Sequence, residues 1–271
     1  MRRTRLCELL DIELPVLGAP MGPEIASLEL AAAVSNAGGL GMISFGGYPP
    51  ARLKERIKRL RSLTPRPFGV NVLLQGPNLP LPEAAFVDVC IEERVPVLSF
   101  FWGDPTPYVE KAHKAGIKVC DQVGSVSAAK RAQQAGVDFI IAQGVEAGGH
   151  VAGTVSTMVL VPRVVDSVAP TPVVAAGGIA DGRGLAAALA LGADAAVLGL
   201  GYLRQPNAMP TRSTKGRFLR RAKKILFTLR CSATAGRTLP TARYEPPLSK
   251  SGWRIRSVAQ NNDRTNPSSA K

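Results

Sequence analysis

The chain has 271 residues, 45% of them hydrophobic, and a formal net charge of +14. Basic and acidic residues are equally numerous in residues 1–201, so the whole excess of positive charge lies in residues 202–271. A neutral body with a basic tail argues against a nucleic-acid-binding surface over the whole protein, and no run reaches the roughly 20 apolar residues of a membrane helix.

Short apolar runs alternate with amphipathic segments from residue 15 to residue 198. Eight runs are predicted to be buried strands: Pro15–Ala19, Leu40–Ser44, Gly69–Leu73, Val97–Phe101, Lys118–Asp121, Phe139–Ala142, Pro172–Ala176 and Ala195–Leu198. The segments between them have helical periodicity: Ser27–Asn36, Ala51–Leu63, Glu83–Glu92, Pro107–Ala115, Ser127–Ala135, Thr157–Val168 and Gly184–Leu191. Apolar strands that alternate with helices are typical of a parallel sheet covered on both faces, and eight such units predict a (β/α)8 TIM barrel.

A doubly wound open α/β sheet is the alternative architecture, but no GxGxxG motif opens its first helix. We therefore assign residues 1–201 to one barrel domain. Residues 202–271 are rich in Arg, Lys, Pro, Ser and Thr, and only Arg217–Leu229 has helical periodicity. This basic tail stands in place of the last barrel helix, and we predict that it is largely disordered.

The most informative segment is Gln143-Gly144-Val145-Glu146-Ala147-Gly148-Gly149-His150. It follows a predicted strand, and loops at the carboxyl ends of parallel strands hold the ligand sites of α/β proteins. Its glycines allow backbone amides to approach a flat or anionic ligand. His150 is a candidate general base, because histidine titrates near neutral pH; a structural histidine is the alternative. No spacing of the cysteines predicts a metal site.

Other loops are expected at the same face of the barrel. Gly177, Gly178 and Gly199 follow the seventh and eighth strands, where backbone amides of TIM barrels hold a phosphate; tight turns without a ligand are the alternative. Asn71 and Gln122 end apolar strands with an amide. Such an amide can bond a ring edge of mixed polarity, as in a flavin, or be satisfied within the core. Phe100-Phe101-Trp102 is either the wall of an apolar substrate pocket or part of the core.

Five segments resemble the nitronate monooxygenase family of FMN-dependent (β/α)8 enzymes: Ala19–Gly22, Gly69–Asn71, Ala142–His150, Ala175–Gly184 and Leu191–Asp194. The resemblance implies oxidation of nitronates or nitroalkanes by O2, with His150 as the catalytic base that removes the proton α to the nitro group. It implies that the partners are a small-molecule substrate and O2, with no specific nucleic acid and no membrane. It also implies FMN contacts from Met21, Asn71, Gln122, Gln143, Gly148, Gly149, Gly177, Gly178 and Gly199.

The Gln-to-His motif is also similar to that of FMN-dependent enoyl-acyl-carrier-protein reductases, which are the alternative. From about residue 200 the sequence departs from the family, because Leu200-Gly201-Tyr202 stands in place of Thr-Arg-Phe. Codons for Gln205–Lys215 can also encode, read two nucleotides later, Thr-Glu-Cys-His-Ala-His-Pro-Glu-Tyr-Lys, which resembles the family segment. We therefore hypothesise a reading-frame shift near Gly199. An inactive frameshifted relative, or a nucleic-acid binder that acts through the basic tail, is the second alternative.

The four cysteines do not suggest a disulfide scaffold, and Cys90 and Cys120 lie in apolar segments that predict buried thiols. A reducing, cytoplasmic compartment is therefore expected. The basic segment Met1–Arg5 is not followed by a long apolar run, so we recognise no signal peptide.

Overall fold

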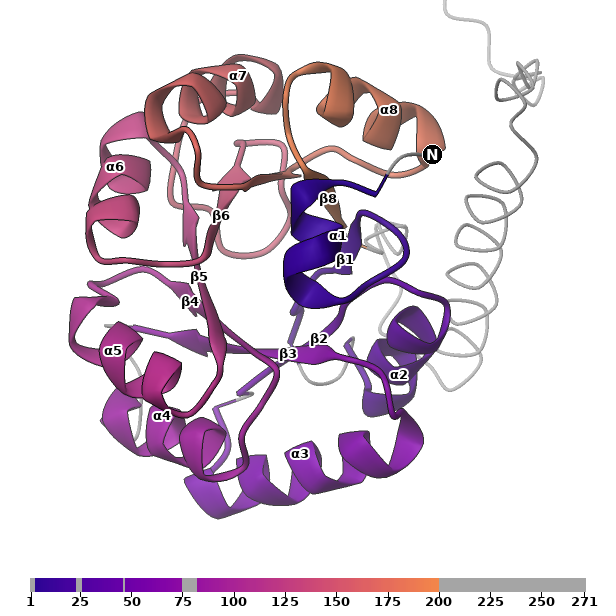
Figure 1. Cartoon of the computed structure of the whole chain (residues 1–271), viewed down its shortest axis with the longest axis vertical. Helices are drawn as coiled ribbons and strands as arrows, with labels where there is room; N and C mark the ends of the chain where they lie inside the picture. The colour runs from indigo at the N-terminus through magenta and orange to yellow at the C-terminus, as the bar shows by residue number, and fades with distance from the viewer. Residues whose placement is uncertain (1–2, 23–25, 46, 75–81, 200–271) are drawn as a thin grey trace, which may run out of the picture. The chain divides into compact units, whose positions relative to one another are not determined.

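The computed structural model describes residues 3–22, 26–45, 47–74 and 82–199. Within these ranges eight parallel strands form one sheet in the order β1-β8-β7-β6-β5-β4-β3-β2, and a bridge between Leu17 and Leu40 joins β1 to β2. The sheet closes into a barrel inside a ring of helices (Figure 1), which confirms the predicted TIM barrel. The strands are β1 (Val16–Gly18), β2 (Gly41–Ser44), β3 (Phe68–Leu73), β4 (Val97–Phe101), β5 (Lys118–Val123), β6 (Phe139–Gln143), β7 (Val173–Ala176) and β8 (Ala195–Leu198).

Seven helices follow strands β1 to β7, and their ends lie within two residues of the predicted ones. Side chains at several helix starts explain this agreement, since Ser27, Ser125 and Asp181 each accept a hydrogen bond from a backbone N–H of the first turn. The helices are α2 (Leu28–Asn36), α3 (Pro50–Leu63), α4 (Glu83–Glu92), α5 (Thr106–Lys114), α6 (Val126–Gln134), α7 (Thr157–Val168) and α8 (Gly182–Ala190).

The chain beyond Gly199, including the predicted tail 202–271 and its segment Arg217–Leu229, lies outside the described residues. The domain boundary at residue 201 and the disorder of the tail therefore stay predictions.

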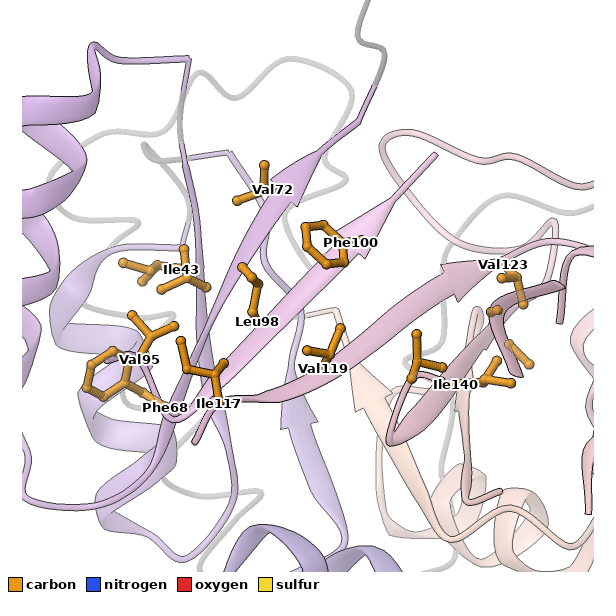
Figure 2. Close-up of a cluster of buried hydrophobic side chains, with 14 of the residues drawn as sticks. Ile43, Phe68, Val72, Val95, Leu98, Phe100, Ile117, Val119, Val123 and Ile140 are labelled. Atoms are coloured by element: carbon orange, nitrogen blue, oxygen red, sulfur yellow. The ribbon is translucent and has the colours of Figure 1, made fainter. Parts of the chain in front are cut away.

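Alternate residues of each strand face opposite sides of the barrel wall. Outward side chains pack against the helices, and Figure 2 shows part of this layer, with Leu98, Val119 and Val123 among its members. Inward side chains form a second cluster that includes Cys120 and Ile141. A polar side chain on one of these strands is therefore enclosed whichever way it points.

A helix that the sequence pattern does not predict, α1 (Arg5–Leu10), covers the amino end of the barrel. Its residues Leu6, Cys7 and Leu10 join the inward cluster. Arg5 forms a two-bond ion pair with Asp194, with N–O distances of 2.9 and 3.0 Å. Six residues span fewer than two helical turns, so periodicity alone does not reveal this helix.

The cysteines in the described part of the chain are buried and free, namely Cys7, Cys90 and Cys120. This confirms the predicted burial of Cys90 and Cys120. Burial raises the pKa of both thiols well above the usual range, so neither is a reactive thiolate. Among the described helices, none has the length and apolar character needed to cross a bilayer.

Candidate active site at the carboxyl edge of the barrel

Two of the predicted cofactor contacts are glutamines that point into the barrel. Gln122 and Gln143 lie two residues after Cys120 and Ile141, which belong to the inward cluster. The predicted strands end one residue before each glutamine, whereas the structure continues both strands because their ladders with the neighbouring strands continue. This correction matters for the site, since an amide within a strand has a fixed direction.

Gln143 connects the barrel interior to the loop that holds His150. Its side chain is 5% exposed, and its Nε2 donates a hydrogen bond to the backbone carbonyl of His150 at 3.0 Å. Its Oε1 is buried and has no hydrogen-bond partner among the described residues. A buried acceptor without a partner is uncommon in proteins and favours a site for a ligand that donates.

Asn71 of β3 lies between two serines on the neighbouring strands. Ser99 donates through Oγ to Asn71 Oδ1 at 3.1 Å, and Ser44 is paired in register with Asn71. The Oγ of Ser44 is buried without a partner in the described part of the chain. Neither serine belongs to a recognisable motif; the available signal in the sequence is a polar residue at an inward position of an apolar strand.

His150 lies exposed on the loop between β6 and α7, with its ring centroid 4.8 Å from that of Trp102. Trp102 also stacks on Phe101 at 4.7 Å. The φ of Trp102 is 63°, in the left-handed region that bulky residues rarely adopt and that is enriched at functional sites. Of the aromatic run, Phe100 and Phe101 are therefore core residues, whereas Trp102 leaves the strand to lie beside His150.

Glu146, whose role the sequence leaves open, binds the start of α7. Its Oε2 accepts from the backbone N–H of Thr157 at 2.9 Å and lies 2.8 Å from the Thr157 hydroxyl. That hydroxyl is also 3.0 Å from the carbonyl oxygen of Gly177. Burial acts to raise the pKa of Glu146, but the hydrogen bonds from Thr157 outweigh it and hold the pKa below its usual value.

Gly144 and Gly177 allow these two loops to approach each other. A Cβ on Gly144 would clash with Thr157, and a Cβ on Gly177 would lie 2.6 Å from the same hydroxyl oxygen. Gly177 also has a φ of 110°, a conformation that only glycine adopts without strain. The loops after β6 and β7 are therefore held together by Thr157, for which the sequence pattern predicts only a place in a helix.

The remaining predicted residues lie on loops at the same edge. Gly148 and Gly149 are exposed on the β6–α7 loop, and Gly178 follows Gly177 after β7. Gly199 follows β8 and lies beside the loop that contains Met21. A Cβ placed on Gly199 would be 3.9 Å from the Cβ of Ala19. Every predicted site residue is thus at the carboxyl edge of the barrel, as a common site requires.

Asp181 occupies part of the proposed phosphate end. It accepts hydrogen bonds from the backbone N–H groups of Arg183 and Gly184 at the start of α8. The Arg183 guanidinium, together with these N–H groups, holds the pKa of Asp181 below its usual range. The start of α8 is therefore already capped, and a phosphate would depend on Gly177, Gly178 and Gly199. No cluster of His, Cys, Asp and Glu suited to a metal ion occurs within the described ranges.

The family model described as nitronate monooxygenase matches residues 3–245, past the point at which the resemblance in the motifs ends. The chain is 37% identical over 242 residues to a probable nitronate monooxygenase of Staphylococcus saprophyticus, covering 74% of the chain and 68% of that protein. It is 38% identical over 219 residues to the (3aS,4S,5R,7aS)-5-hydroxy-7a-methyl-1-oxo-octahydro-1H-indene-4-carboxyl-CoA dehydrogenase of Rhodococcus jostii, covering 81% of the chain.

Among solved structures, FabK of Thermotoga maritima is similar with a TM-score of 0.69 and 48% identity, over 74% of this chain and 62% of FabK. The chain spans 60% of the length of the Rhodococcus jostii dehydrogenase. These two relatives therefore each contain more than a third of their length beyond the part that matches.

Proposed function

The chain belongs to the nitronate monooxygenase family, as its motifs predict, and we propose that it is an FMN-dependent enzyme that oxidises nitronates or nitroalkanes with O2. One observation carries this proposal: Gln143 bonds the backbone of His150 while it presents a buried, unpartnered oxygen to the barrel interior. One side chain would thereby hold the loop of the proposed base and offer an acceptor to a flavin ring.

The residues at this edge fit FMN. Gln143 Oε1 and Ser44 Oγ are buried without partners in the described part of the chain, and the edge of a flavin ring has donors and acceptors for both. Bound FMN would supply the electron acceptor for the substrate and the reductant for O2. The ring would be held by Asn71, Gln122 and Gln143, and the rest of the cofactor by Met21, Gly148, Gly149, Gly177, Gly178 and Gly199.

His150 is the proposed base. Its exposed imidazole takes the proton from the carbon next to the nitro group, which converts a neutral nitroalkane into the nitronate. Trp102 restricts the imidazole through ring contact at 4.8 Å, and Gln143 fixes the backbone at 3.0 Å. A preformed nitronate has already lost this proton, so its oxidation does not require the base.

The decisive experiment compares the two substrates in the full-length FMN-loaded protein. For His150→Asn we expect kcat/KM on nitroethane to fall by about 10²–10⁴, while oxidation of ethylnitronate and the flavin absorption bands remain. His113→Asn is the matched control. His113 is the other histidine of the chain, in the last turn of α5 and bonded to Asp138. Unchanged turnover of nitroethane by His150→Asn would remove the base assignment.

The enoyl-acyl-carrier-protein reductase reading is the second candidate, and the 48% identity to FabK favours it in part. The substrates that the protein turns over distinguish the two candidate activities. Oxidation of NADH or NADPH by a crotonyl thioester without O2 supports the reductase, whereas O2 uptake with ethylnitronate supports the monooxygenase. A colourless protein that does not bind added FMN supports the inactive relative.

A further inference from the structure

A cavity of about 810 Å³ lies outside the barrel wall, between α5 and α6. Neighbouring helices such as α6 and α7 pack closely, but α5 and α6 lie apart in the ring (Figure 1). The cavity is bounded by the loop 102–106, by residues 121–125 at the end of β5, by α6 and by residues 152–155. Its volume is in the range of small-molecule sites.

Asp121 forms part of the inner wall of this cavity. Val119 and Val123 belong to the outward layer of β5 (Figure 2), so Asp121, midway between them, points outward too. The residue is 7% exposed, and its Oδ1 is buried with no hydrogen-bond partner in the described ranges. A carboxyl group in an apolar layer is unfavourable unless a partner is supplied.

Burial favours the uncharged form of Asp121, and a hydrogen bond from the backbone N–H of Gln122 acts against it. Asp104 repels a carboxylate at this position, and Arg131, an exposed residue of α6, opposes this effect only in part. No ion pair to Asp121 is formed within the described residues. Burial is the largest cause and raises the pKa of Asp121 to about 8. An uncharged carboxyl group is a hydrogen-bond donor through its O–H, so it is suited to a neutral acceptor rather than to a cation.

Trp102 links the cavity to the proposed base His150. This residue lines the cavity, and its ring is the one that contacts His150 at 4.8 Å. Gln122, a proposed ring contact, lines the cavity as well. A substrate whose reacting carbon lies at His150 would pass Trp102 to place its remaining part on the side of Asp121.

We propose that this cavity receives the non-reacting end of the substrate, and that Asp121 there donates a hydrogen bond to a neutral acceptor such as a ketone, ester or amide carbonyl. The assignment of the cavity to a substrate end rests on the proposed function. The expected substrates are thus nitro compounds that carry a carbonyl group at a distance from the reacting carbon, rather than plain or cationic alkyl chains.

Binding is tested without turnover, through the fluorescence of Trp102. Trp253→Phe leaves Trp102 as the only tryptophan, because the chain has two. The full-length protein with this substitution is titrated with 2-hexanone, 1-hexene and hexylammonium, which lack a nitro group. Asp121→Asn keeps a donor and Asp121→Leu removes it, while Asp166→Leu, at an exposed position of α7, is the control for a general effect of the substitution.

We expect all compounds that bind to quench Trp102. Asp121→Leu should weaken 2-hexanone about tenfold, the value of one hydrogen bond, and leave 1-hexene unchanged or tighter. Asp121→Asn should retain most of the affinity for 2-hexanone. Three results would overturn the proposal. In the first, Asp121→Leu weakens the binding of 2-hexanone and of 1-hexene equally. In the others, the protein prefers hexylammonium and Asp121→Asn abolishes that preference, or no compound quenches Trp102.

The same preparation separates this inference from the proposed function. O2 uptake with nitroethane, which has no distant group, reports on the reaction alone. Ketone binding that depends on Asp121 in a protein that does not oxidise nitroethane or ethylnitronate refutes the proposed function and leaves the carbonyl site. Normal oxidation of nitroethane without any binding of 2-hexanone refutes the carbonyl site and leaves the proposed function.

Discussion

The inner and outer faces of the barrel wall each contain a buried oxygen without a partner, and they differ in chemistry. On the inner face, the amide of Gln143 is always neutral and is anchored at 3.0 Å to the backbone of His150. On the outer face, the carboxyl group of Asp121 is ionisable, and burial raises its pKa to about 8. The inner group therefore lacks only a hydrogen bond, whereas the outer group also makes the stability of the fold depend on pH.

The largest expected effect concerns this pH dependence. The folded protein binds a proton at Asp121 more tightly than the unfolded chain, whose carboxyl titrates near pH 4. The stabilising contribution of the proton is therefore complete below about pH 4 and is lost as the pH rises through about 8. The free energy of unfolding should fall by up to about 1.4 kcal/mol per pH unit across this window.

Urea denaturation at pH 5 and pH 8 measures this change. Asp121→Asn cannot ionise, so its free energy of unfolding should vary much less between these two conditions. Asp166→Asn, at an exposed site, should behave as the unsubstituted chain does. A parallel pH dependence in Asp121→Asn would show that other groups cause it, and the contrast between the two faces would lose its basis.

The next effect compares apolar replacements on the two faces at neutral pH. Asp121→Leu removes a buried carboxyl group whose Oδ1 has no partner in the described part of the chain, next to a cavity that can accept the larger side chain, so we expect a gain of about 1–3 kcal/mol. Gln143→Leu removes an unpartnered oxygen but also breaks the bond to His150, so we expect no gain. Thermal and urea unfolding of the two variants decide whether the anchoring bond makes this difference.

The third effect is on cofactor affinity and belongs to the inner face alone. Gln143→Leu should weaken FMN binding about tenfold, because one hydrogen bond to the ring is lost. Gln143→Glu retains an acceptor and should bind FMN more tightly than Gln143→Leu does. Flavin fluorescence titration of the apoprotein measures both, and equal dissociation constants in the two variants would exclude Gln143 as a contact to the ring.

The two faces also differ in how well the sequence predicts them. The barrel, its strands and the position of Gln143 follow from apolar periodicity and from the glycine-rich loop, because both patterns are local. The direction of Asp121 follows from its parity with Val119 and Val123 once β5 is known to extend to Val123. That its Oδ1 has no partner among the described residues is a matter of which side chains α5 and α6 bring near it, and no local pattern encodes that.

The contacts of Glu146 are also not predictable from a local sequence pattern, because they join residues that are distant in the sequence. Its partner Thr157 lies 11 residues further along the chain, and the close approach of Thr157 to this loop requires that Gly144 has no Cβ. The signal in the sequence for these contacts is an acidic residue in the loop before α7. The N-cap residue of this helix, Ser156, makes no side-chain hydrogen bond to the first turn. The short helix α1 is not predictable from periodicity, because its six residues leave too few positions for a period to be seen.

The smallest expected effect tests how firmly the loop of His150 is held. In Glu146→Gln an amide oxygen can still accept from the N–H of Thr157, but the negative charge at the start of α7 is lost. Because Glu146 is exposed and solvent screens its charge, we expect a loss of less than about 1 kcal/mol at pH 7. Since the pKa of Glu146 lies below its usual value, this loss should shrink as the pH falls through the titration of the carboxyl.

Glu29→Gln, in the first turn of α2, also removes a charge from a helix start but breaks no bond between loops. An equal loss in both variants would mean that Glu146 acts through the helix dipole alone, and that His150 depends on Gln143 rather than on Thr157 for its position.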